Sequence, residues 1–175
     1  MRYDFETLVD RSHCGSGKWD GMKEKNPNVR EGIVPLSVAD MEFKNPPEVV
    51  EGLKAYLDTH ILGYTSPTEE YKAAVCQWMK DQHSWDIQPE WICCTHGVVT
   101  ALFMLVSALT QPGDGVIILT PVYYPFYMAT KANGRKVKGC PLVYGDNTYT
   151  IDFDLLDQIA AEDDSKLMIF CSPHN

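Results

Sequence analysis

The stretch Val116-Ile117-Ile118-Leu119-Thr120 decides the fold class of this chain. Its unbroken aliphatic run lacks the polar alternation of a half-exposed strand and is typical of a strand that is covered on both faces. Turn residues at 111–115 precede the run, and Pro121 follows it. We therefore expect a central strand of a mostly parallel sheet here.

Strands and helices alternate on both sides of this run. The patterns predict further strands at 91–95, 136–142, 149–151 and 166–171, and helices at 98–109, 124–132 and 154–161. Helices of this length between strands favour right-handed βαβ units, and therefore an α/β fold with a mostly parallel sheet.

The first part of the chain is different. Residues 1–47 are rich in Gly, Pro, Asn and charge, and predict an irregular arm that must pack on something else. Pro46-Pro47 opens an amphipathic helix, and a second helix begins near Pro67. We expect the second helix to turn Tyr71, Ala74, Val75, Trp78 and Met79 inward.

Composition excludes several classes of protein. The chain has 175 residues, of which 45% are hydrophobic and 22% charged, as in globular domains. Its net charge of −9 repels phosphate backbones and anionic lipids, so we expect neither nucleic acid nor a membrane as a partner. The six cysteines lack the spacing of metal ligands, and the first residues lack the apolar core of a signal peptide, so no metal and a cytoplasmic location are expected. Cys93, Cys94 and Cys171 lie in apolar runs and are interpreted as small core residues.

Ligands of parallel sheets bind beyond the carboxyl ends of the strands. Three such ends carry unusual residues: Thr95-His96-Gly97, Thr120-Pro121-Val122-Tyr123 and Cys171-Ser172-Pro173-His174-Asn175.

The strand end at Thr95-His96-Gly97 predicts a phosphate site. Gly97 permits close backbone approach, and the helix that follows offers unpaired N–H donors and the positive end of its dipole. A tight turn before a core helix is the alternative. The other glycine-rich stretch, Gly15-Ser16-Gly17-Lys18, does not fit a phosphate loop, because Ser12 stands where glycine is needed and Trp19 where Ser or Thr would bind magnesium.

The other two ends supply an aromatic ring and a polar pair. Tyr123 can lay its ring on a flat heteroaromatic ligand, although aromatic residues at this spacing are also typical of a core. His174 and Asn175 can contact the same ligand or can be turn residues.

Together, these motifs resemble those of a known family. A glycine-led helix, then Pro-x-Tyr-x-Pro-Phe, then Ser-Pro-His-Asn at a strand end, in this order, resembles the aminotransferase-like pyridoxal 5′-phosphate (PLP) enzymes of fold type I. Within them the chain looks most like the cystathionine β-lyase branch of carbon–sulfur lyases, which includes the maltose-regulon modulator type. The stretches that carry this narrower resemblance are 18–20, 37–43, 63–64 and 121–126.

The resemblance implies a role for each matching position. Gly97, Val98 and Val99 would bind the phosphate of PLP through their backbone N–H groups. Tyr123 would stack on the pyridine ring, and Asn175 would hydrogen-bond its phenolic oxygen. Tyr64 would reach the phosphate held by the partner subunit of a homodimer. Ala39 and Asp40 would lie near the substrate carboxylate. A surface aromatic for Tyr64 and a loop cap for Asp40 remain alternatives.

The resemblance also implies what these residues leave out. In the family the lysine that forms a Schiff base with PLP, the acid opposite the pyridine nitrogen and a substrate-binding arginine all follow Ser-Pro-His-Asn. We therefore expect the catalytic lysine beyond Asn175, an inactive fragment, and an N-terminal portion of a three-layer αβα domain. Residues 1–47 would be the arm with part of the small domain, and 48–175 the start of the large domain. Such a fragment would expose an apolar strand edge near 166–171 or 116–119 and dissolve poorly.

For the parent enzyme the resemblance implies α,β-elimination from a sulfur amino acid such as cystathionine, which yields pyruvate, ammonia and a thiol. Transamination is the alternative within enzymes, and a regulatory binding protein that keeps the fold is the alternative outside them. An unrelated small-molecule site in an α/β domain is a further alternative.

Overall fold

The computed structural model describes residues 3–175. They divide into two compact units, with the boundary between Ser66 and Pro67. Each unit is described by itself. Among the described residues, no helix has both the length and the apolar character needed to cross a membrane.

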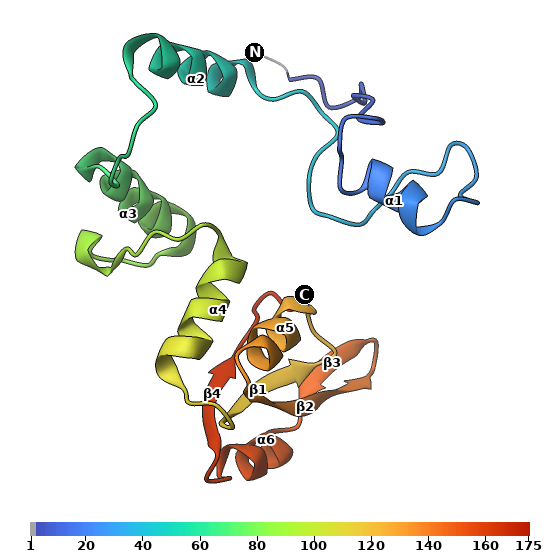
Figure 1. The fold of residues 1–175 in the computed structure, drawn as a ribbon, viewed down its shortest axis with the longest axis vertical. Helices are drawn as coiled ribbons and strands as arrows, with labels where there is room; N and C mark the ends of the chain where they lie inside the picture. Colours follow the sequence, from blue (N-terminus) through green and yellow to red (C-terminus); the bar gives the residue numbers. More distant parts are fainter. Residues whose placement is uncertain (1–2) are drawn as a thin grey trace. The chain divides into compact units, whose positions relative to one another are not determined.

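Among its described residues, the first unit contains two helices, α1 (Trp19–Lys25) and α2 (Pro47–Thr59) (Figure 1). The irregular arm predicted over 1–47 is therefore wrong at α1. The carboxylate of Asp20, in the first turn of α1, accepts hydrogen bonds from the backbone N–H groups of His13, Gly15 and Ser16. These bonds fold the preceding loop back onto the helix, a tertiary effect that apolar periodicity does not report. Helix α2 begins at the prolines, as predicted, with Pro47 as its first residue.

In the second unit, α3 (Glu69–His83) begins where the sequence predicts. The Thr68 hydroxyl caps it by accepting a hydrogen bond from the N–H of Tyr71 at 3.2 Å. The prediction that its apolar residues point into a core is wrong for Tyr71, Ala74 and Trp78, which are exposed. Periodicity identifies an apolar face, but it does not say whether an element of the described chain covers it.

The strand predicted at 91–95 is also wrong. Pro89–Trp91 form a short 3-10 helix, η1, and 92–95 are irregular. A strand needs a neighbour to pair with its backbone, and none of the residues 3–175 supplies one to this segment. Cys93 and Cys94 are consequently exposed, which corrects their interpretation as core residues, while Cys171 is half-buried.

The sheet has the order β3-β2-β1-β4. Its strands are β1 (Gly115–Thr120), β2 (Lys136–Gly145), β3 (Thr148–Ile151) and β4 (Ser165–Ile169). Strand β1 pairs in parallel with both β2 and β4, and β3 returns antiparallel to β2 through a turn at 146–147. The mostly parallel sheet is confirmed. Of the two alternatives for an exposed strand edge, 166–171 and 116–119, the structure supports the first, because β4 lies at the edge of the sheet and β1 lies inside it.

Helices α4 (Val98–Leu109), α5 (Pro125–Ala132) and α6 (Phe153–Ala160) accompany these strands. Helix α5 connects β1 to its neighbour β2. Helix α6 connects β3 to β4, which lies on the opposite side of β1 from β2, so this connection runs along the sheet in the other direction. Right-handed connections that run in opposite directions along a sheet place their helices on opposite faces. The unit therefore has the expected three-layer αβα arrangement (Figure 1).

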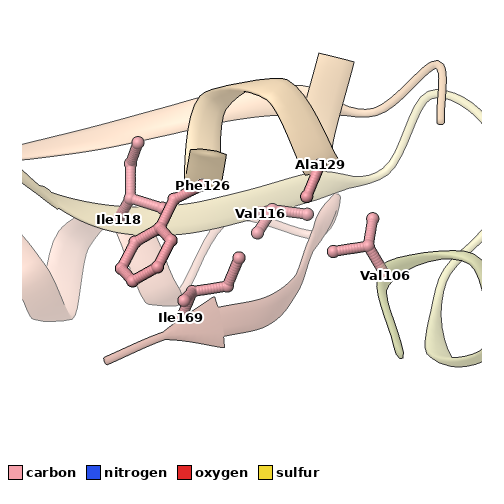
Figure 2. Packing of buried hydrophobic residues seen from close by; sticks show 6 residues of the cluster. All are labelled: Val106, Val116, Ile118, Phe126, Ala129 and Ile169. Atoms are coloured by element: carbon pink, nitrogen blue, oxygen red, sulfur yellow. The ribbon is translucent and has the colours of Figure 1, made fainter. Parts of the chain in front are cut away.

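The core lies between β1, β4 and the helices α4 and α5. Its buried side chains are Val106, Val116, Ile118, Phe126, Ala129 and Ile169 (Figure 2). Ile117 and Leu119 are also buried, but they alternate with these residues along β1 and so face the other side of the sheet. Burial on both faces is what the continuous apolar run predicts.

Candidate functional site

The segments that follow β1 and β4 are bound to each other. The N–H of Tyr123 donates a hydrogen bond to the carbonyl oxygen of Asn175 at 2.7 Å. The His174 Nε2 lies 2.6 Å from the carbonyl oxygen of Pro121. The structure therefore brings together two of the three strand ends that the sequence singled out, because β1 and β4 are adjacent and parallel.

A cavity of about 500 Å³ opens at this junction. Its lining residues come from both strand ends and from the β2–β3 hairpin: Pro121, Val122, Tyr123, Tyr124, Leu142, Tyr149, His174 and Asn175. Leu142 and Tyr149 were missed by sequence reasoning. The parallel pairing of β2 with β1 brings Leu142 here, the antiparallel return of β3 brings Tyr149, and no local pattern signals either contact. The walls are mostly apolar, with a few polar groups, as is typical of sites for small organic ligands.

The aromatic residues at this junction divide into core and surface. Phe126 is 7% exposed and belongs to the core, as the alternative interpretation of the aromatic run proposed. Tyr123 is 36% exposed and meets Phe126 edge-on, with ring centroids 6.1 Å apart. The edge contact supports the ring of Tyr123 while leaving part of it open to the cavity.

Gly97 forms the N-cap of α4, with φ 95° and ψ 159°. This backbone conformation is essentially restricted to glycine. Among residues 3–175, no heavy atom lies within 4 Å of the place a Cβ would take, and Val98 is 76% exposed. The first N–H groups of α4 have no partner within their own helix, so they face an open surface. Among the described residues, the surroundings of Gly97 leave room for an anion.

These features fit the two ends of PLP. Helix α4 begins at the end of the unit where β1 and β4 finish and where the C-terminus lies (Figure 1). The N–H groups after Gly97 suit a phosphate, and the partly open ring of Tyr123 suits a pyridine ring. The residues lining the cavity at Tyr123 do not include 97–99.

The remaining predicted site residues lie in the first unit. Tyr64 is fully exposed, and Ala39 is exposed. Asp40 is half-buried, and its Oδ2 accepts a hydrogen bond from Arg11 Nη1 at 2.7 Å. These contacts, together with Lys18, lower the pKa of the Asp40 carboxyl below its usual value and keep it ionised.

The chain belongs to the aminotransferase class I and II family, whose model matches residues 31–175. Among individual proteins, cystathionine beta-lyase PatB of Bacillus subtilis is 42% identical over 172 residues, which are 98% of this chain and 44% of that protein. The chain therefore spans less than half the length of this relative.

Two solved structures are similar along the whole chain. The crystal structure of cystalysin from Treponema denticola, which contains a pyridoxal 5′-phosphate cofactor, has a TM-score of 0.95 and 58% identity. The PLP-bound C-S lyase from Staphylococcus hominis has a TM-score of 0.89 and 31% identity. Each match covers 100% of this chain and 44% of the other. The resemblance inferred from the motifs is confirmed at the level of the family and the fold.

Proposed function

We propose that the full-length protein containing this chain is a PLP-dependent carbon–sulfur lyase that eliminates the thiol of a sulfur amino acid such as cystathionine. The products are pyruvate, ammonia and the thiol. The observation that carries this proposal is the junction of Tyr123 and Asn175 beside an open cavity, in a chain 58% identical to a PLP-containing cystalysin.

The residues of this chain would hold the cofactor at three points. The N–H groups of Gly97, Val98 and Val99 bind the phosphate, the ring of Tyr123 covers the pyridine, and the Asn175 side chain donates to its phenolic oxygen. When bound, the cofactor withdraws electrons from the α-carbon of the substrate, which makes the α-proton acidic. The apolar walls at Leu142 and Tyr149 limit water in the cavity.

The first unit and a second subunit would complete the site. The exposed Tyr64 of one subunit reaches the phosphate bound by the other in a homodimer, and the segment at Ala39 and Asp40 meets the substrate carboxylate. The Schiff-base lysine is supplied by the part of the full-length protein beyond these 175 residues, so this chain alone is inactive. We expect the enzyme to work in the cytoplasm on free amino acids.

The test is an assay of the full-length protein with cystathionine. We expect pyruvate without any added keto acid, and a visible absorption band at about 420 nm from the lysine-bound cofactor. The family also suggests transamination as a second candidate function, since its model describes aminotransferases. Strict dependence of turnover on an added keto acid would favour that candidate and contradict the lyase. Absence of the band would contradict both.

A further inference from the structure

Lys18 is a buried cation that the proposed function does not use. Its side chain is 7% exposed, and three oxygens surround its ammonium group. Nζ lies 2.7 Å from the carbonyl oxygen of Asp40, 3.0 Å from Asp40 Oδ1 and 2.5 Å from Glu42 Oε1. The contact with the Asp40 carbonyl is a hydrogen bond, and the contacts with the two carboxylate oxygens are ion pairs.

The remaining oxygens of the two carboxylates are also occupied. Arg11 Nη1 donates to Asp40 Oδ2 at 2.7 Å, and Trp19 Nε1 donates to Glu42 Oε2 at 2.7 Å. The four charged side chains Arg11, Lys18, Asp40 and Glu42, which we call the ion cluster, thus sum to zero charge. Because the Asp40 carboxylate forms ion pairs with both Arg11 and Lys18, it is a poor partner for a substrate.

The ion cluster also fixes the backbone from 40 to 42. Lys18 binds the carbonyl of Asp40, Arg11 Nη1 lies 3.4 Å from the carbonyl of Met41, and the N–H of Val9 donates to the carbonyl of Glu42 at 2.8 Å. Each of three consecutive carbonyl groups is therefore held by a residue from the first part of the chain.

Immediately before this fixed segment, the backbone is strained. Val38 has φ 62°, the left-handed region that a β-branched residue rarely adopts, and its side chain is 60% exposed. Such a conformation persists only where the surroundings impose it. Exposed packing at Val38 cannot impose it, whereas the clamp at Asp40–Glu42 can.

The backbone N–H groups in and after the strained segment are unpaired among the described residues. Within residues 3–175, the backbone N–H groups of Val38, Ala39 and Asp40 donate to no acceptor. Free N–H groups on an exposed loop suit a carboxylate, which accepts several hydrogen bonds.

We propose that Lys18 and Arg11 are positioning residues, which clamp Asp40–Glu42 so that the N–H groups at Val38–Ala39 meet the carboxylate of an amino-acid substrate. This inference rests on the proposed function. It divides the roles of the two predicted substrate residues: the backbone at Ala39 contacts the substrate, and the Asp40 carboxylate holds the backbone in place.

The test compares two probes on the full-length, cofactor-loaded protein. L-Alanine carries a carboxylate, and ethylamine is the same molecule without it. For Lys18→Met we expect the dissociation constant of L-alanine, measured by calorimetry, to rise about tenfold, the effect of losing one charge-assisted hydrogen bond. The dissociation constant of ethylamine should stay unchanged, and Lys18→Arg should restore much of the affinity for L-alanine.

Lys138→Met is the matched control. Lys138 also contacts two carboxylates, those of Glu162 and Asp164, and is 15% exposed, but it lies in β2. Its replacement removes a similar ionic contact and should leave both dissociation constants unchanged. If Lys18→Met does not fold, Arg11→Met is the second variant, because the Arg11 side chain is 29% exposed. It should weaken the binding of L-alanine and leave the binding of ethylamine unchanged.

Two results would overturn the inference. One is unchanged L-alanine affinity in a folded Lys18→Met or Arg11→Met protein, and the other is an equal loss for both probes. Failure of the proposed function gives a different result, because the unmodified protein would then release no pyruvate from cystathionine in the absence of an added keto acid.

Discussion

The N–H of Tyr123 donates to the carbonyl oxygen of Asn175 at 2.7 Å, so the ends of β1 and β4 are joined through main-chain atoms. A side-chain substitution at either residue leaves this bond possible. The cofactor contacts of the two side chains can therefore be tested without breaking the junction that positions them.

Tyr123→Leu should weaken PLP binding by about tenfold, because the aromatic contact is lost while an apolar side chain still fills the place. Tyr123→Phe keeps the ring and should bind PLP nearly as well as the unmodified protein. Equilibrium dialysis of the full-length protein against PLP measures both values. Equal weakening by the two substitutions would show that the hydroxyl, not the ring face, holds the cofactor.

Gly97→Ala should destabilise the start of α4, because a Cβ at φ 95° costs about 1–3 kcal/mol. Displacement of the N–H groups should weaken the binding of PLP about tenfold. The affinity for pyridoxal, which lacks the phosphate, should stay unchanged. Gly52→Ala in α2 is the control, since its backbone is helical and the change should stabilise by about 0.5–1 kcal/mol. Denaturation and cofactor titration distinguish the two glycines, and an unaltered PLP affinity in Gly97→Ala would argue against the phosphate site.

Ile118→Ala should lower the free energy of unfolding by about 2–5 kcal/mol, because the fully buried side chain leaves a cavity between β1 and α5. Ile118→Val removes one methyl group and should cost about 0.5–1.5 kcal/mol. Val143→Ala, at a half-exposed position in β2, should cost less than either. Urea denaturation of the full-length protein measures the loss in free energy of unfolding for each variant. A larger loss for Val143→Ala than for Ile118→Ala would contradict the central position of β1.

Acid stability should depend on Asp164. Hydrogen bonds from Lys138 and Lys136 lower the pKa of this carboxyl from its usual 3.8 to about 2. A lowered pKa means that Asp164 stabilises the fold above its usual pKa, and that this contribution is lost as the pH falls through about 2. The stability difference between the unmodified protein and Asp164→Asn should therefore be constant near neutral pH and shrink below about pH 4.

Asp163→Asn provides the comparison, since Asp163 is exposed and adjacent in sequence. Its effect on stability should be small at every pH. A stability difference for Asp164→Asn that grows as the medium becomes more acidic would contradict the pairing with the two lysines.

Much of the second unit could be predicted from local pattern. Helix α4 has the bounds that were expected, Val98–Leu109, and β1 begins one residue before the expected run. These elements carry strong apolar signals that end at turn residues, and their partners lie in neighbouring elements. The failures at 91–95 and at the inward face of α3 share a cause, because an apolar pattern describes a surface that seeks a partner without saying which segment provides it.

The candidate site divides in the same way. Gly97 and Tyr123 were found because glycine and aromatic residues at strand ends are visible in a single stretch of sequence. Leu142 and Tyr149 were not found, because the β2–β3 hairpin carries them to the cavity. Lys18 belongs to a stretch that carries the family resemblance, but no local pattern gives it a role, because its contacts with Asp40 and Glu42 join residues more than twenty positions apart.

By itself, the sequence determined the alternation of strands and helices, the burial of β1 and the positions of the glycine and tyrosine at the strand ends. These depend on the chemistry of consecutive side chains, which is local. Only the tertiary structure decided that Arg11 and Lys18 form ion pairs with Asp40 and that Val38 is held in a left-handed conformation. Ion pairs and backbone strain arise from groups distant in sequence, and those groups meet only when the chain folds.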